Sequence, residues 1–331
     1  MLGRFLATLL FCASLGAAVH NTVNTWNGLL QYDEDWGYAD IRTGAHTFWW
    51  LYAVKPANNR PLILWLQGGP GASSTGFGNF EETGPKRMNN TDNEATWSYL
   101  DDNQLARVNA QAKSCQKKVD QGQWKQATTC WGNMEDLIGA ETGGVSWYNI
   151  LKYGGQDDWS KKRRKRSAFT ALNGLFNRHV AFYQKDALSN YMDTTVRDKL
   201  GIIPDSVKFG AQSNAVFNFQ SEDFMKPNWD TVDVLLKNGT NVIVYNGNQD
   251  LICDSVGTEM WMARLTWPGM ASFKTAAKVK FGTKSFPLAG FKKRHENLSF
   301  YLILRGGHMV AYDTPEAAVH IVEQILKDYS S

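Results

Sequence analysis

The sequence has little excess charge, few cysteines and no long internal apolar run. Its formal net charge of +3 is too small to indicate binding to nucleic acid. No internal stretch has the length and apolarity of a membrane span, and we see neither a set of metal ligands nor a nucleotide-binding loop. We therefore expect no nucleic-acid partner, no membrane span, no metal and no cofactor. The 331 residues, 43% of them apolar, suffice for one large α/β domain with an insertion or for two ordinary domains.

The N-terminus has the pattern of a signal peptide. Arg4 supplies a positive charge, residues 5–15 are mostly apolar, and the small residues 16–18 suit cleavage. A buried first helix is the less favoured alternative, so we exclude residues 1–18 from the fold, together with Cys12. Three glycosylation sequons fit the same route, and we expect a glycoprotein that is secreted or lysosomal; the sequons begin at Asn89, Asn238 and Asn297.

The cysteines that remain are odd in number, which in a secreted protein means a free thiol or a missing partner. Cys115 and Cys130 lie on two neighbouring predicted helices, so we predict that they form a disulfide. The alternative is that both are reduced and buried. Cys253 is left over, and it either lines a site or is a buried small hydrophobe.

Apolar periodicity predicts strands that alternate with helices, which favours a mainly parallel sheet. We expect buried strands at 47–54 and 61–66, and further strands at 241–245 and 298–304. We expect helices around 124–138 and 169–180, with a turn at 120–122. The last helix should have Thr314 as its N-cap and Pro315 at its first position. The basic run 161–166 is either a processing loop or a solvated loop. We divide the mature chain into 19–100, a helical insertion at 101–200, and 201–331.

Three of these strands end in turns that can carry chemistry. Residues 64–74 lead from a strand into a glycine-rich turn, whose free backbone N–H groups can bind an oxyanion or a carboxylate. Asp250 ends the turn after strand 241–245, and His308 ends the turn after strand 298–304. Alone, Asp250 could be a turn-former and His308 a surface residue. Together they match the second and third members of a Ser-Asp-His order.

These strings resemble the serine carboxypeptidase family. The resemblance covers most of the mature chain, including segments 36–42, 77–85 and 147–151, and is most specific at 65–74. It implies an α/β-hydrolase fold, in which helices flank a mainly parallel sheet and a helical insertion forms a lid. It also implies hydrolysis that releases single residues from peptides with a free C-terminus.

The resemblance also implies roles for individual residues. Asp250 and His308 match the acid and the base of the triad, and the N–H of Gly69 matches one donor of the oxyanion hole. Three further positions match the residues that hold the terminal carboxylate of the substrate: Gln67, Gly68 and Glu82.

The nucleophile of the family is missing. The family places its serine in a Gly-Glu-Ser-Tyr-Gly-Gly elbow before the helical insertion, and this chain contains no Gly-x-Ser-x-Gly. The familial pattern of 95–97 passes into the insertion at about Leu100–Asp101, so we infer that a long block is absent, with the serine, one oxyanion donor and several central strands. Ser73 is the best substitute, but Thr75 stands where an elbow needs a small residue. We interpret Ser73 and Ser74 as helix-start residues.

Three functions remain under consideration. The first is a serine carboxypeptidase in a truncated form, which is inactive because no acyl-enzyme can form. The second is a secreted protein that binds peptides through the carboxylate-holding turn and has no turnover. The third is an acyltransferase with the same triad, which shares the missing nucleophile. Loss of central strands exposes sheet edges, so we also expect a rearranged sheet or low stability.

Overall fold

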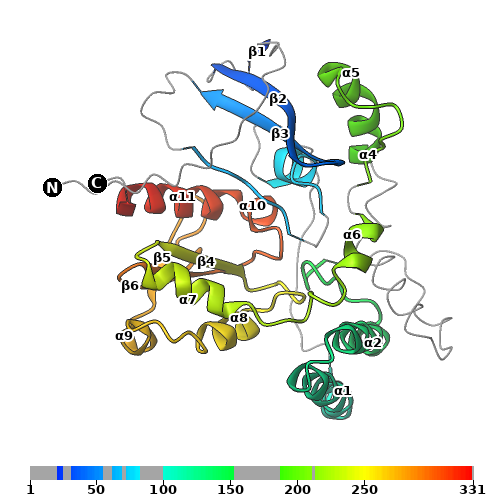
Figure 1. Ribbon diagram of the computed structural model, residues 1–331. Helices are drawn as coiled ribbons and strands as arrows, with labels where there is room; N and C mark the ends of the chain where they lie inside the picture. Colours follow the sequence, from blue (N-terminus) through cyan, green and yellow to red (C-terminus); the bar gives the residue numbers. More distant parts are fainter. Residues whose placement is uncertain are drawn as a thin grey trace.

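The computed structural model describes residues 21–24, 31–54, 62–68, 72–82, 100–152, 187–210 and 213–329 (Figure 1). Its strands form two separate sheets, one from the N-terminal and one from the C-terminal part of the chain. Several expectations lie outside the described residues: the signal peptide with Cys12, the sequon at Asn89, Gly69, the basic run 161–166 and the helix at 169–180.

The N-terminal sheet is antiparallel, in the order β1-β2-β3. Its strands are β1 (Asn21–Asn24), β2 (Gln31–Arg42) and β3 (Ala45–Val54). The strand expected at 47–54 is confirmed, but it is not buried throughout, because Trp49 and Leu51 are exposed. Several short helical elements lie beside this sheet and pack Leu188, Val196 and Leu200 into one apolar cluster; they are η2 (Gly78–Glu82), α4 (Ala187–Tyr191), η5 (Met192–Val196) and α5 (Arg197–Leu200).

The C-terminal sheet has the order β4-β7-β6-β5, with β4 and β7 parallel and the other pairs antiparallel. Its strands are β4 (Val242–Gly247), β5 (Val279–Phe281), β6 (Gly290–His295) and β7 (Leu298–Ile303). The strands expected at 241–245 and 298–304 are therefore confirmed. Alternate residues of β7 point to opposite faces, so Leu298 and Phe300 enter one core cluster while Tyr301 and Ile303 enter another.

Helices cover both faces of the C-terminal sheet (Figure 1). Residues of α11 (Pro315–Tyr329) pack on the side of Tyr301 and Ile303, and residues of α7 (Trp229–Lys237), α8 (Ser255–Met262) and α9 (Met270–Thr275) pack on the side of Leu298 and Phe300. The last helix begins at Pro315 as expected. The carbonyl of Thr314 accepts from the N–H of Ala318 at 3.1 Å, as expected of the N-cap residue, and its hydroxyl donates to the carbonyl of Val310 at 3.0 Å. Val310 begins the short helix α10 (Val310–Asp313).

Two long helices form a hairpin at the start of the predicted insertion. They are α1 (Asp102–Asp120) and α2 (Trp124–Thr142), and the turn expected at 120–122 lies between them with Gly122 at φ 69°. Asp101 begins α1 with a capping box, because its side chain accepts from the N–H of Gln104. A disulfide joins Cys115 to Cys130, the pair predicted from the sequence. Downstream, α6 (Asn214–Phe219) leads toward α7.

The α/β class is confirmed, but neither described sheet is mainly parallel: the N-terminal sheet is antiparallel and the C-terminal sheet is mixed. Within the described ranges, β4 and β7 make the one parallel pairing. The prediction of a buried strand at 61–66 is wrong. Residues 62–68 pair with no strand, and the exposed fractions of Leu62 and Leu64 are 84% and 80%. A strand forms only where a neighbouring strand pairs with its backbone, and no described strand pairs with this segment. Within the part of the chain that the structure describes, no helix has the length and apolarity to cross a bilayer.

Candidate active site

The parallel strands β4 and β7 bring two loops to the same edge of the C-terminal sheet. Gly247 pairs with Ile303 at the end of the ladder, and the loops that follow contain Asp250 and His308. A Cβ atom on Gly247 would lie 2.3 Å from the carbonyl oxygen of Gly306, so glycine is needed for the loops to approach. The N–H of Gln249 donates to that same oxygen at 2.8 Å, which ties the loops together.

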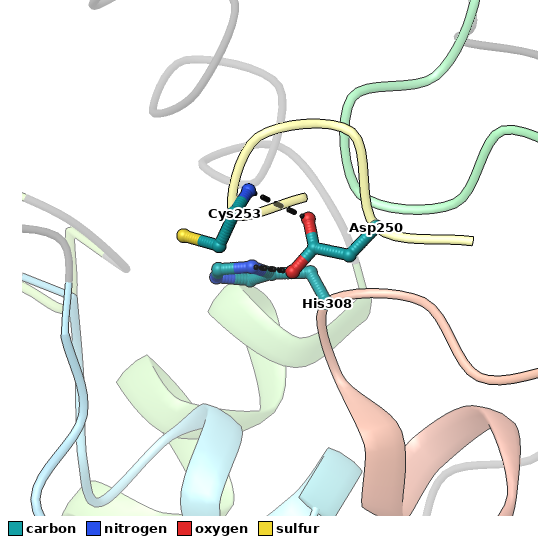
Figure 2. A group of neighbouring side chains, drawn as sticks. All are labelled: Asp250, Cys253 and His308. Atoms are coloured by element: carbon teal, nitrogen blue, oxygen red, sulfur yellow. Dashed lines mark hydrogen bonds and ion pairs between the residues drawn. The ribbon is translucent and has the colours of Figure 1, made fainter. Parts of the chain in front are cut away.

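Asp250 and His308 form a hydrogen bond across this loop pair. The distance from Nδ1 of His308 to Oδ2 of Asp250 is 2.9 Å (Figure 2). The other carboxylate oxygen, Oδ1, accepts from the backbone N–H of Cys253 at 3.0 Å. The Asp250 side chain is 3% exposed, whereas that of His308 is 33% exposed. A buried carboxylate with both oxygens engaged therefore fixes the orientation of an imidazole that is partly exposed.

The protonated form of His308 is strongly favoured. Burial of the ring would by itself lower the pKa of His308, but hydrogen bonds and charges from Asp250 and Cys253 outweigh burial and raise this pKa to about 10. At neutral pH the ring is an imidazolium, which can donate a proton but cannot accept one. The Asp250–His308 pair can therefore hold a proton on a ring that is partly exposed.

The loop of His308 depends on residues to which the sequence assigned no role. The N–H of His308 donates to the carbonyl of Tyr148 at 2.6 Å, and the N–H of Gly307 donates to Oδ2 of Asp313 at 2.7 Å. Asp313 also accepts from Asn149 at 2.9 Å and from Lys152 at 2.6 Å. The string 147–151 had been noted only as part of the resemblance, and nothing in the sequence pointed to Asp313.

Cys253 completes a group of three chemically active side chains. Its thiol is exposed and not in a disulfide, so the expectation of a buried small hydrophobe is wrong. The Sγ atom, a ring nitrogen of His308 and a carboxylate oxygen of Asp250 lie within 4.8 Å of one another, a spacing that could hold a metal ion. The direct hydrogen bond between His308 and Asp250 already occupies two of these ligands, however. The arrangement therefore fits proton transfer better than metal binding.

The glycine-rich turn is described only in part. The N–H of Gln67 donates to the hydroxyl of Ser74 at 3.0 Å, and its side-chain oxygen accepts from the indole of Trp65 at 3.1 Å. Gly68 is exposed, with open space where a Cβ would lie. Gly69 and the side chain of Glu82 lie outside the described residues. The convergence of this turn on His308 therefore stays a prediction.

The hydroxyl of Ser73 is engaged in the turn. It accepts from the N–H of Gly76 at 2.9 Å and lies 3.4 Å from the hydroxyl of Thr75. The same hydrogen-bond pattern is typical of a residue that starts a helical turn. This geometry supports the interpretation of Ser73 as a capping residue.

Comparison with known proteins identifies relatives over most of the chain. The family model described as serine carboxypeptidase matches residues 25–100 and 94–328. The retinoid-inducible serine carboxypeptidase of Rattus norvegicus is 33% identical, with 88% of this chain and 91% of the relative covered. The protein of the same name from Homo sapiens is 30% identical, with 88% and 91% covered.

The alignment with the rat protein is longer than the part of this chain that it covers. It extends over 412 positions, whereas 88% of the 331 residues is about 290 residues, so more than about 100 positions have no residue of this chain opposite them. The two parts of the family match meet at 94–100, which is also where the familial pattern of the sequence breaks off.

A solved structure shows the same fold. The crystal structure of Kex1Δp, a prohormone-processing carboxypeptidase from Saccharomyces cerevisiae, is 20% identical and has a TM-score of 0.51, with 70% of this chain and 49% of that chain covered. The chain thus spans about half of that solved enzyme, and this likeness shows the fold alone. The family match over both parts of the sequence shows that the chain belongs to the serine carboxypeptidase family.

Proposed function

We propose that this chain is a shortened form of a secreted serine carboxypeptidase, which keeps the acid and the base of the triad and lacks the serine. The observation that carries the proposal is the hydrogen bond between His308 and Asp250 at the ends of two parallel strands. Such a carboxylate fixes the imidazole tautomer and stabilises its protonated form during acyl transfer. The reaction of the complete enzyme is the release of single residues from peptide C-termini.

The shortened form makes no serine acyl-enzyme. No Gly-x-Ser-x-Gly is present in the sequence, and the hydroxyl of Ser73 is engaged with the N–H of Gly76. The high pKa of His308 points the same way, because an imidazolium cannot accept the proton of an attacking hydroxyl. Loss of a triad member leaves roughly 10³–10⁴-fold acceleration over water, and loss of an oxyanion donor lowers this further.

The absence of an internal block explains three features together. The two parts of the family match meet at 94–100, and the alignment with the rat protein needs positions that this chain does not fill. The apolar segment 62–66 is exposed, and β4 lies at the edge of its sheet. Central strands inserted after about Leu100 would give both elements a neighbour. A skipped exon or a faulty gene model would each produce this sequence, and sequencing the transcript across codons 95–105 distinguishes them.

A second candidate is a secreted protein that binds peptides without turnover. The observation in its favour is the open approach to Gly68, next to Gln67 and within the turn that resembles a carboxylate-holding site. Glu82 and Gly69 complete this proposed site. The measurement is the affinity for a peptide with a free C-terminus compared with the same peptide amidated at its C-terminus. Equal affinity for the two peptides rules this candidate out.

The proposed location is the secretory pathway, with a secreted or lysosomal destination. The disulfide between Cys115 and Cys130 fits an oxidising compartment, in which such bonds form and persist. The signal-like residues 1–18 and the three sequons support the same route.

The test of the first proposal uses purified protein and a serine-directed phosphonate. We expect no serine to be labelled and no hydrolysis of an N-blocked dipeptide. The matched control is a version with the family's Gly-Glu-Ser-Tyr-Gly-Gly block restored after Leu100, which is expected to be labelled at the new serine. Labelling of any serine in the present chain, with turnover of the dipeptide, would contradict the proposal.

A further inference from the structure

Cys253 is fixed in place beside the Asp250–His308 pair. Its backbone N–H donates to Asp250 at 3.0 Å, and its carbonyl accepts from the side chain of Asn246 at 2.7 Å. Its Sγ atom belongs to the group of three ligand atoms that lie within 4.8 Å of one another. Figure 2 shows the thiol beside the imidazole ring. The backbone of Cys253 is therefore held while its sulfur stays open to reagents.

We propose that Cys253 is a nucleophile in its own right, placed beside the imidazole of His308, and that it accepts acyl groups from activated esters. This inference goes beyond the proposed function, which concerns a serine-dependent reaction. A thiolate is the reactive form of cysteine, and a neighbouring protonated histidine favours that form. Asp250 acts as the positioning residue, because it orients the ring and not the sulfur.

The electrostatic surroundings favour a positive charge on the ring of His308. The raised pKa of His308 arises against the effect of burial, partly from its hydrogen bond and charge interaction with Cys253. Among the described residues, the titratable groups beside this pair include Asp250 and Tyr148, whose ring centroid lies 5.2 Å from that of His308. The neighbouring carboxylate of Asp254 is turned to the N–H of Gly257 at 2.7 Å, where it caps α8. A buried carboxylate behind the ring thus stabilises the cation.

The proposed reaction has two steps. The sulfur of Cys253 attacks the carbonyl carbon, so that a C–S bond forms, the C–O bond to the alcohol breaks, and the leaving group takes the proton of His308, which becomes neutral. Water then attacks the thioester while neutral His308 accepts its proton. The C–S bond breaks, the acid is released, and thiolate and imidazolium are restored. Peptide bonds lie outside the proposal, because their poor leaving group requires an oxyanion hole.

The first measurement is the rate of alkylation of folded protein by iodoacetamide at pH 6, with peptide mapping to assign the adduct to Cys253. We expect the His308→Gln variant to react more slowly by about tenfold or more, because the imidazole beside its thiol has been removed. Circular dichroism checks the fold of the variant. In concentrated urea both proteins should react at the same rate, which removes any intrinsic difference between the preparations.

The second measurement is a pre-steady-state burst with p-nitrophenyl acetate. We expect a burst of p-nitrophenolate that matches the protein concentration, a thioester mapped to Cys253, and loss of the burst in Cys253→Ala. Asp250→Asn, which keeps the side-chain shape, is expected to slow the burst without removing it.

Equal alkylation rates in folded wild type and folded His308→Gln, or a burst that persists in Cys253→Ala, would overturn this inference. Failure of this inference is distinguishable from failure of the proposed function, because failure of the proposed function would be seen as labelling of a serine by the phosphonate. A chain with an inert Cys253 and no labelled serine would leave the proposed function intact.

Discussion

The carboxylate of Asp313 accepts a hydrogen bond from the backbone N–H of Gly307, one residue before His308, at a distance of 2.7 Å. The same oxygen accepts from the side chain of Asn149 at 2.9 Å, and the other oxygen accepts from Lys152 at 2.6 Å. One buried carboxylate thus connects the loop after β7 to the segment around Tyr148. The position of His308 depends on this connection as well as on Asp250.

Asp313→Ala is expected to lower the free energy of unfolding by about 1–3 kcal/mol, because it leaves the N–H of Gly307 without its acceptor. Urea denaturation measures the change. Lys152→Met is the control, because its partly exposed ion pair with Asp313 contributes less than about 1 kcal/mol. Unfolding of Asp313→Ala at the same urea concentration as wild type would show that this carboxylate does not hold the loop.

The stability of the protein should fall as the solution becomes alkaline. Folding raises the pKa of His308 from its ordinary value of 6.5 to about 10, so the folded state holds this proton more tightly than the unfolded state. The resulting stabilisation is fully present below pH 6.5 and is lost as the pH rises toward about 10. Free energies of unfolding measured between pH 6 and pH 10 should show this decline. In Asp250→Asn the decline should be much shallower, and an unchanged slope in that variant would count against the pairing.

Two leucines at opposite extremes of exposure provide a test of the fold. Leu298 in β7 is fully buried, whereas Leu64 in the unpaired segment is 80% exposed. Leu298→Ala is expected to lower the free energy of unfolding by about 2–5 kcal/mol, because it opens a cavity in the core. Leu64→Ala is expected to change it by less than about 0.5 kcal/mol and to reduce aggregation. A large loss of stability from Leu64→Ala would mean that this segment is packed.

Much of the C-terminal half could be predicted from the sequence. The strands that lead to Asp250 and His308 are apolar, end in turn residues and find their partners within the chain, so the local pattern and the fold agree. The pattern of Leu62 to Leu66 is equally apolar, yet it forms no strand, because strand formation depends on neighbouring strands that a local pattern cannot supply. The roles of Tyr148 and Asp313 were not predictable, since they act through contacts between distant segments. The sequence left open whether Cys253 lines a site or is buried, and its exposure in the structure rules out the buried alternative.

The two sequons within the described residues differ in their surroundings. Asn238 ends α7 and is exposed. The side-chain nitrogen of Asn297 donates to the carbonyls of Leu236 and Thr240, at 3.0 and 2.9 Å. A sugar on that nitrogen would displace one of its two hydrogens. We expect Asn238 to be glycosylated and Asn297 to be unmodified, which mass spectrometry after enzymatic deglycosylation can measure. A glycan at Asn297 would contradict the hydrogen-bonding arrangement around β7.

The most direct test of the central claim is an NMR titration of the His308 ring, with Asp250→Asn as the matched variant. The claim that the acid and the base of the triad are assembled predicts a pKa of His308 far above 6.5 in the wild type, near 10, and a marked fall of this pKa in the variant. A ring that titrates close to 6.5 in both proteins would contradict the claim.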